Sequence, residues 1–342
     1  MANYTLANLV KDQTVLQGAF ASQDVRFRTP EVWKLFLKNT ENFLPNYKES
    51  RTREDRVLEA IYNVRSQRAL GSERQANHTG SRGDAGVITP AFTTKQDKFS
   101  SSLKQADISV MEAVEQANND MLNAVANFME GLEAVSSTAL FSNRTGVNVA
   151  TSDGAFSALN DVFEITESTN GDSAPYIAKM VMDINKYQGV QCTFVCDSIS
   201  YRKFMKLANQ GTMNATNTAF QFSGIEFVHD PTLTTKAVTL DVTYTKGFWI
   251  VVPANTIGAL TWIPRQNRQG VQTTVNTYGS LINPFDGQTY AFHSYEERAD
   301  DSANNGYTQD VVTQKELSID VALEIAPLSV ATETTLFAFA LI

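Results

Sequence analysis

Apolar residues recur at steps of three and four between residues 107 and 140. Those that follow this spacing are Met111, Val114, Ala117, Met121, Val125, Phe128, Leu132 and Val135. The spacing places them on one face of an α-helix. The helix is expected to begin near Asp107, or at Ser109 with Glu112 completing a capping box. At 1.5 Å per residue it would be about 50 Å long, so the pattern predicts one long structural helix.

The segment before this helix is polar and predicted to be extended. Residues 71–86 contain only two apolar residues, Ala76 and Ala85, and cannot pack a core of their own. Residues 87–99 return as a strand rich in threonine and phenylalanine, whereas residues 52–64 fit either a helix or a strand. These stretches predict a long hairpin that projects from the body of the protein and packs against a neighbouring chain.

The first 50 residues predict an arm and a short helix. Residues 1–28 show no sustained period and are expected to be extended. A helix then begins with Thr29 as its cap and Pro30 at its first position, and residues 39–50 are expected to form a loop. The helical spacing is carried by Val32, Leu35 and Phe36.

After residue 143 helical and strand patterns alternate, which predicts an α+β fold. One helix is expected from Ser173 to about Gly189, with a single buried face made of Ile177, Met180, Val181 and Ile184. A second helix is expected to be capped by Asp197 or Ser198 and to run to Leu207. Strands are expected at residues 190–196, 219–222, 225–228, 247–253, 256–263, 290–295 and 317–325. The last of these alternates strictly, which predicts one buried face and one solvated face.

Charge is distributed unevenly along the 342 residues, whose net charge is -9. Residues 1–105 hold 16 basic and 11 acidic residues, a net charge of +5, whereas residues 106–342 hold 12 and 26, a net charge of −14. The acidic body argues against tight binding of nucleic acid, because phosphate neutralisation would supply most of that affinity. Opposite charges within one chain instead allow copies to attract each other through different surfaces.

The sequence carries no recognisable catalytic or cofactor motif, and we expect no enzyme activity and no cofactor. His78, His229 and His293 lack a second ligand at metal spacing. The acidic run Glu296, Glu297, Asp300 and Asp301 offers oxygen ligands for a hard cation, but it has no fixed coordination spacing and is better explained as a solvated loop. Trp33, Trp249 and Trp262 lie in apolar stretches and are expected to be core residues.

Compartment and redox state follow from the same residues. The amino end lacks the features of a signal peptide, and no stretch approaches the roughly 18 apolar residues that span a bilayer. Production in the cytosol and no membrane partner are therefore expected. Cys192 and Cys196 fall in one predicted strand, where their Cα atoms would lie about 13 Å apart, too far for a disulfide. We expect two small buried hydrophobic side chains.

The order of arm, short helix, hairpin, long helix, α/β unit and return strands resembles the major capsid protein of tailed bacteriophages. The matching segments are residues 87–99 and 103–106, which are similar to the family's extended loop and the start of its spine helix, and residues 192–201 and 227–233, which are similar to its axial domain. Residues 249–253 and 319–325 resemble strands of the axial and peripheral domains. The resemblance covers most of the chain and rests on layout, because this family has no invariant catalytic signature.

The resemblance implies the phage major capsid fold, with residues 1–50 as N-terminal arm and short helix, 51–105 as extended loop, 106–145 as spine helix of the peripheral domain, 146–262 as axial domain and 263–342 as return strands. It further implies an icosahedral virion shell, assembled in the host cytoplasm from pentamers and hexamers around double-stranded DNA that is held only non-specifically. Implied partners are a portal protein and possible separate scaffold or decoration proteins. We expect no fused scaffold or decoration domain.

The residues predicted to form the subunit interface are Arg65, Arg68, Arg74, Arg82, Lys95 and Lys98. Some family members crosslink their shells through a lysine and an asparagine, and Lys95 and Lys98 stand where such a lysine would be, with no partner identified. Two alternatives remain open. The first is the shell protein of a bacterial nanocompartment, which shares this fold and encloses an enzyme; the second is a soluble α/β enzyme without a recognisable motif.

Overall fold

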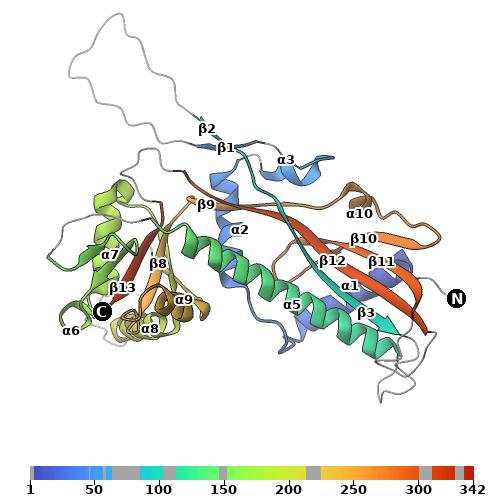
Figure 1. Cartoon of the computed structure of the whole chain (residues 1–342), viewed down its shortest axis with the longest axis horizontal. Helices are drawn as coiled ribbons and strands as arrows, with labels where there is room; N and C mark the ends of the chain where they lie inside the picture. Colours follow the sequence, from blue (N-terminus) through green and yellow to red (C-terminus); the bar gives the residue numbers. More distant parts are fainter. Residues whose placement is uncertain are drawn as a thin grey trace, which may run out of the picture.

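The computed structural model describes residues 4–45, 47–56, 59–63, 85–102, 113–145, 152–212, 225–299, 310–327 and 335–342. They form an α+β fold with two large sheets at opposite ends of an elongated molecule, joined by the long helix α5 (Figure 1). The predicted strand at residues 219–222 and most of the polar hairpin, residues 64–84, lie outside the described residues.

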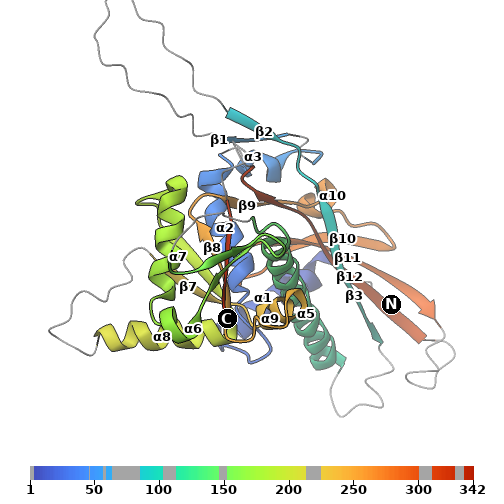
Figure 2. The ribbon, with the colours of Figure 1, turned by 60° about the vertical axis from the view of Figure 1, so that its left-hand side comes forward.

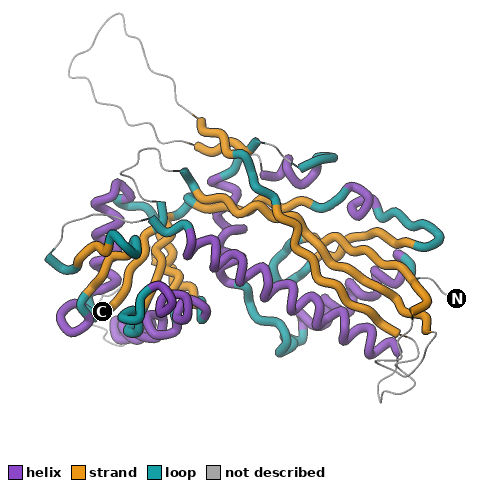
Figure 3. Tube along the Cα trace, in the orientation of Figure 1, coloured by secondary structure: helices purple, strands orange, loops and turns teal. Residues whose placement is uncertain are grey.

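The long helix is confirmed as α5, Ala113–Ser142, and its expected beginning at residues 107–112 lies outside the described residues. Met121 and Val125 have no exposed surface, and Phe128 and Leu132 are nearly as buried. Val135 is only half-buried. The apolar face of α5 packs against the extended sheet and against α2, so helical periodicity identified the core-facing side correctly (Figure 3).

The extended sheet is antiparallel, with the strand order β10 (Asn276–Ile282), β11 (Thr289–Ala299), β12 (Asp310–Ile325) and β3 (Thr93–Ser102). The far half of β12 also pairs with β9, Ile257–Trp262. The prediction of a solvated face on β12 was wrong at Asp320 and Ala322, which are 4% and 1% exposed. Ala322 packs with Phe43 and Leu44, while Asp320 binds Arg56, so this face of the strand is covered near its C-terminal end.

The second sheet is mixed, with the strand order β4 (Ala155–Ser157), β5 (Val162–Ile165), β13 (Phe337–Leu341), β8 (Phe248–Pro253), β6 (Cys192–Cys196) and β7 (Ile225–His229). Helices α7 (Ala174–Met182) and α8 (Ser198–Thr212) cover one face. The other face packs against α9 (Thr232–Leu240) and the end of α5. Because both faces are covered, every residue of β6 and β8 is buried.

The extended N-terminal arm was a wrong prediction, because Leu6–Ala21 form helix α1. Leu9, Leu16 and Ala19 face the core, but the buried Asp12 interrupts this stripe and hid its period. The helix lies across β10 so closely that a Cβ at Gly279 would overlap the side chain of Leu9. The N-terminal segment is therefore packed on its own subunit.

The short helix is confirmed as α2, Glu31–Phe43, although Pro30 occupies its cap position and not its first turn. Residues 39–43, predicted as loop, continue this helix, and the side chains of Asn39 and Thr40 donate hydrogen bonds to the carbonyls of Leu35 and Phe36, one turn earlier. The rest of that predicted loop contains α3, Tyr47–Thr52. Buried polar side chains were thus mistaken for a loop signal.

Residues 87–99 form the end of one strand, β2 (Ala85–Ile88), and most of another, β3, where one strand was predicted. The ambiguous stretch 52–64 ends in strand β1, Ala60–Asn63. Helix α7 continues into a π-helical turn, η1 (Asp183–Tyr187), and its predicted buried face was wrong at Met180 and Ile184, which are exposed. Ala174, Ala178 and Met182 complete the buried face instead.

Seven further elements of the described chain escaped the pattern analysis. Helix α9, strand β10 and the C-terminal strand β13 were not predicted, and neither were β4, β5 and the short helices α6 (Glu167–Asn170) and α10 (Arg265–Gln269). Strand β13 is Phe-Ala-Phe-Ala-Leu, a continuous apolar run with no alternation. Such a run is typical of a strand buried on both faces, and periodicity alone does not identify it.

Candidate subunit interface

Strands β1 and β2 form an antiparallel ribbon that shares no hydrogen bonds with the two large sheets in the described part of the chain. Its inner face contributes Ala60, Tyr62 and Ile88 to a small core with Phe43 and Leu44. Figure 2 shows the ribbon at the edge of the molecule beside α3. A two-stranded ribbon is marginally stable alone, so this inner contact fastens it to the body.

The outer face of the ribbon presents an apolar pair. Ile61 and Val87 lie directly opposite each other in the register and are 45% and 58% exposed. Cross-strand apolar pairs stabilise a ribbon most when they are covered. Within one subunit the described residues leave this pair open to solvent, so the ribbon offers a second packing face.

Gly86 fixes how the ribbon packs. It lies opposite Tyr62 in the register, and the Tyr62 ring occupies the position where a Cβ on Gly86 would be. The ring packs towards Phe43 at a centroid distance of 6.2 Å. Any larger residue at position 86 would displace Tyr62 from this small core and loosen the base of the predicted hairpin.

Of the six predicted interface residues, Lys95 and Lys98 lie on β3, at the outer edge of the extended sheet. Lys98 is exposed and forms an ion pair of 3.7 Å with Glu316 on β12, and Lys95 is half-buried. Arg65, Arg68, Arg74 and Arg82 lie outside the described residues. The structure therefore brings the two lysines together on one edge strand, and the role of all six remains a prediction.

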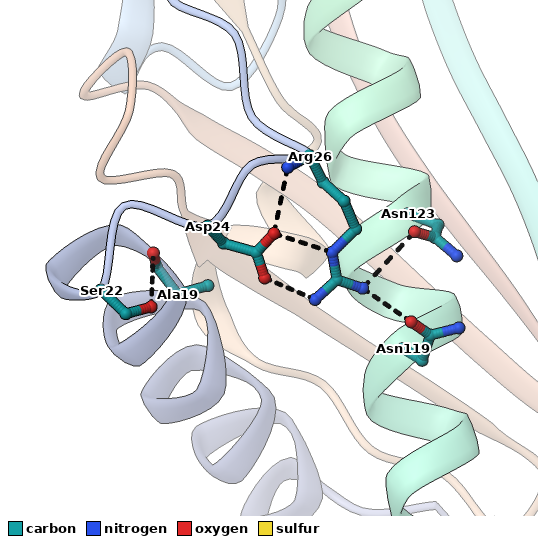
Figure 4. A network of polar contacts seen from close by, with 6 residues as sticks. All are labelled: Ala19, Ser22, Asp24, Arg26, Asn119 and Asn123. Atoms are coloured by element: carbon teal, nitrogen blue, oxygen red, sulfur yellow. Dashed lines mark hydrogen bonds and ion pairs between the residues drawn. The ribbon is translucent and has the colours of Figure 1, made fainter.

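The segment after α1 is tied to the long helix by a polar network (Figure 4). Arg26 forms an ion pair of 2.6 Å with Asp24 and donates to the Asn119 side-chain oxygen at 2.7 Å. Asn123, one turn along α5, accepts a longer bond of 3.5 Å from the same guanidinium. This network, together with the stacking of Phe27 on Phe285 at 4.0 Å, holds the N-terminal region on its own subunit.

A buried charge cluster joins α1 to the extended sheet. Lys315 on β12 is 5% exposed, and its ammonium lies 5.1 Å from the centre of the Tyr4 ring and 5.5 Å from that of Phe99. Asp12 accepts a hydrogen bond from the Tyr4 hydroxyl and, with Asp120, provides negative charge for Lys315. Burial lowers the pKa of Lys315 and raises that of Asp12. These buried groups therefore hold helix α1 on the extended sheet.

A second cluster lies where α2, α5 and the β7–α9 loop meet. Glu133 of α5 accepts hydrogen bonds from the backbone N–H groups of Val32 (3.0 Å) and Trp33 (2.8 Å), the first turn of α2. Glu31 accepts the His229 N–H at 2.9 Å, and Asp230, 1% exposed, follows β7. Burial raises the pKa of Glu133 to about 7. The two backbone hydrogen bonds act in the opposite direction, whereas the nearby carboxylates of Asp230 and Glu31 raise the pKa further.

Among the described residues, no group of three metal-ligating side chains occurs, and no helix is long and apolar enough to cross a membrane. Cys192 and Cys196 are confirmed as free and buried. Burial raises the pKa of the Cys192 thiol to about 11 and raises that of Cys196, which disfavours the reactive thiolates. Trp33 and Trp249 are core residues as predicted, whereas Trp262 is half-buried.

Glu133, Asp230 and the Ile61–Val87 pair were missed by the sequence analysis. Ile61 fell in the stretch that fitted both a helix and a strand, so its face was undetermined. Glu133 stands beside the buried Leu132 in a helix with many polar residues, and nothing local marks it as the cap of a different helix. The exposed position of Ile61 and Val87 follows from the pairing of β1 with β2, and the capping role of Glu133 follows from the contact of α5 with α2.

The chain is thus an α+β protein in which one long helix connects an extended antiparallel sheet to a mixed sheet, with a separate ribbon at its edge. No protein-family model matches the sequence, and no curated protein matches it. Among solved structures, it is similar to the Cyanophage Pam1 capsid (10% identity, 83% of this chain and 84% of that chain, TM-score 0.45). It is also similar to the capsid of Ralstonia phage GP4 (9%, 85% and 86%, TM-score 0.45) and to the Cyanophage A-1(L) capsid (12%, 92% and 93%, TM-score 0.45).

Proposed function

We propose that this chain is the major capsid protein of a tailed bacteriophage, a structural protein that assembles into an icosahedral shell around double-stranded DNA. The observation that carries the proposal is the β1/β2 ribbon. Its inner face is fastened to the body, while Ile61 and Val87 on its outer face stay exposed. A second copy of the chain would cover this face and supply the burial that one subunit lacks.

The distribution of charge supports the same assembly. The basic N-terminal third carries +5 and the remainder −14, so different surfaces of two copies attract each other. An acidic body also allows DNA to be packed without adhering to the wall. In this proposal the copies form pentamers and hexamers, Arg65, Arg68, Arg74 and Arg82 with Lys95 and Lys98 contact neighbouring copies, and a portal protein occupies one vertex.

Electron microscopy and sedimentation of the expressed protein, with and without a scaffold protein, test this proposal. Closed particles or capsomer-sized rings are expected. Replacing Ile61 and Val87 together by aspartate should leave the subunit folded and abolish the particles. Val242→Asp is the matched control, because Val242 is 79% exposed but lies away from the ribbon. A strictly monomeric wild-type protein at high concentration with scaffold present would refute the proposal.

The contents of particles made in the native host distinguish the two shell alternatives. Nuclease-protected double-stranded DNA is expected inside a phage head, whereas a nanocompartment would retain a protein cargo and no genome. Recovery of an enzyme in place of DNA would overturn the phage assignment and leave the shell function standing.

A further inference from the structure

A pocket of about 320 Å³ opens between α3, β9, α10 and the β10–β11 hairpin. This volume is at the lower end of the range for ligand pockets, about 300–1,000 Å³. The described residues that line it include two arginines, Arg51 and Arg268, and no aspartate or glutamate. Trp262 forms an aromatic wall, and Ser280 and Thr289 add hydroxyl groups. The lining therefore combines positive charge, donors and an apolar surface.

The arginines are held in place by neutral partners. Arg51 donates to the Gln288 side-chain oxygen at 3.1 Å and stacks over Tyr47, with its guanidinium carbon 5.4 Å from the ring centre. Arg268 donates to the backbone carbonyls of Arg51 (2.9 Å) and Arg53. A guanidinium that gives up hydration gains most when it meets an anion. These contacts orient the charges without neutralising them.

Two further observations favour an anion as the ligand. Burial lowers the pKa of Arg51 and the Tyr47 phenol opposes this, so the guanidinium is partly desolvated, and no carboxylate among the described residues offsets the effect. The Nε–H of Arg268 is buried and lacks a hydrogen-bond partner among the described residues. Three acidic side chains of the neighbouring segments are otherwise engaged. Glu54 binds Arg265, Asp320 binds Arg56, and Asp286 accepts hydrogen bonds from the Gln288 N–H and the Tyr290 hydroxyl.

We propose that this pocket is a receptor for a carboxylate, and that in the assembled shell an acidic side chain of a second copy of this chain occupies it. The partner assignment rests on the proposed function; the anion preference does not. The acidic body, with 26 acidic residues against 12 basic ones, supplies such side chains on a neighbouring copy. A single half-open pocket suits one side chain, whereas DNA would be recognised by a continuous basic surface.

Tryptophan fluorescence of the unassembled protein tests the anion preference directly. Of the three tryptophans, Trp33 and Trp249 have no exposed surface, so Trp262 alone reports on dissolved quenchers. With each ion normalised to its quenching of free N-acetyltryptophanamide, iodide should quench roughly threefold more strongly than caesium, because positive potential concentrates anions locally. Added succinate should protect Trp262 from iodide. Equal normalised quenching by the two ions, or protection by a short DNA duplex but not by succinate, would overturn the proposal.

Variants separate the charge of Arg51 from its structural contacts. Arg51→Gln should remove most of the iodide preference, and Arg51→Lys should retain it. Lys48→Gln is the matched control on the same short helix, because Lys48 is exposed and pairs with Glu41 outside the pocket. Loss of the preference in the control as well would show a general surface field and refute the pocket.

Particle yield then tests the occupant. Arg51→Gln should lower assembly at least about tenfold relative to Lys48→Gln at the same protein and salt concentration. The variant loses the contacts of Arg51 with Gln288 and Tyr47, so a modestly lower melting temperature is expected, and the assay is run well below it. Normal assembly of a folded Arg51→Gln protein that has lost its iodide preference would refute the second-copy assignment. If the wild type itself fails to assemble, the proposed function fails, while the quenching result still decides whether the pocket prefers anions.

Discussion

Glu133 tests how the start of helix α2 is held against helix α5. Its carboxylate accepts both N–H bonds at the start of α2, and its pKa is raised to about 7 from an ordinary value near 4.5. Between these two values the folded state holds a proton that the unfolded state has released. Folding stability must therefore fall as pH rises from about 4.5 to about 7, with the favourable contribution fully present below the lower value.

The size of the effect follows from the shift. A displacement of about 2.5 pKa units corresponds to about 3 kcal/mol, at 1.36 kcal/mol per unit. Glu133→Gln should remove this pH dependence, because the amide does not titrate. At low pH it should also destabilise the protein, since the amide nitrogen cannot accept the bond that one of the two N–H donors of α2 makes. This deficit should shrink as pH rises, because only the wild type loses stability on ionisation.

Urea denaturation of the wild type and the variant from pH 5 to pH 8 measures the difference. Subtracting one curve from the other cancels the other titrating groups, among them Glu324, whose pKa is also raised to about 7 by burial. Glu130→Gln, an exposed change on the same helix, is the control and should match the wild type. If Glu133→Gln keeps the wild-type slope with pH, then Glu133 does not titrate in this range and the electrostatic account of the junction is wrong.

Three other changes test separate parts of the structure. Val125→Asp buries an unpaired charge at a fully enclosed position and should destabilise by about 3–5 kcal/mol in thermal or urea unfolding; a stable variant would contradict the facing of α5. Replacing Cys192 and Cys196 together by alanine should cost only packing energy, and native-state thiol labelling should be slow; fast labelling or loss of a bound metal would contradict their core role. The double variant Arg68→Glu and Arg74→Glu should leave circular dichroism unchanged and impair assembly, and added salt should also impair assembly of the wild type. Normal shells from the variant at low and high salt would show that these charges do not contribute to assembly.

Helix α5 and the start of α2 could be predicted from the sequence, because each has an exposed face that the spacing of polar and apolar residues records. Strands β6, β8 and β9 were predicted from short apolar runs, although β6 and β8 are buried on both faces. The cap of α8 was also predicted, and the Asp197 side chain accepts the Ser200 N–H at 2.7 Å. Strand β13 is an apolar run of the same kind and was missed, because a strand buried on both faces leaves no periodic pattern.

Buried polar residues caused the opposite error. Asp12 made α1 look like an unstructured arm, and Asn39 and Thr40 made the end of α2 look like a loop. In the fold each has a specific partner: Asp12 lies with Tyr4 and Lys315, and Asn39 accepts the N–H of Asn255 at 3.0 Å. A single sequence cannot distinguish a solvated polar residue from one paired across 200 or more positions, because the distinguishing information is tertiary.

The same limit applies to the interface. Charge asymmetry and a polar hairpin could be recognised in the sequence, and they predict that copies associate. The apolar Ile61–Val87 pair could not, because its outward direction depends on the register of β1 with β2 and on the packing of Tyr62 over Gly86. A one-residue slip in that register would place Ile61 and Val87 on opposite faces of the ribbon, and the exposed pair would be lost. In the proposed assembly, the small core beneath the ribbon would determine which side chains face a neighbouring copy. A substitution at Gly86 should then weaken assembly, although Gly86 itself lies on the inner face of the ribbon.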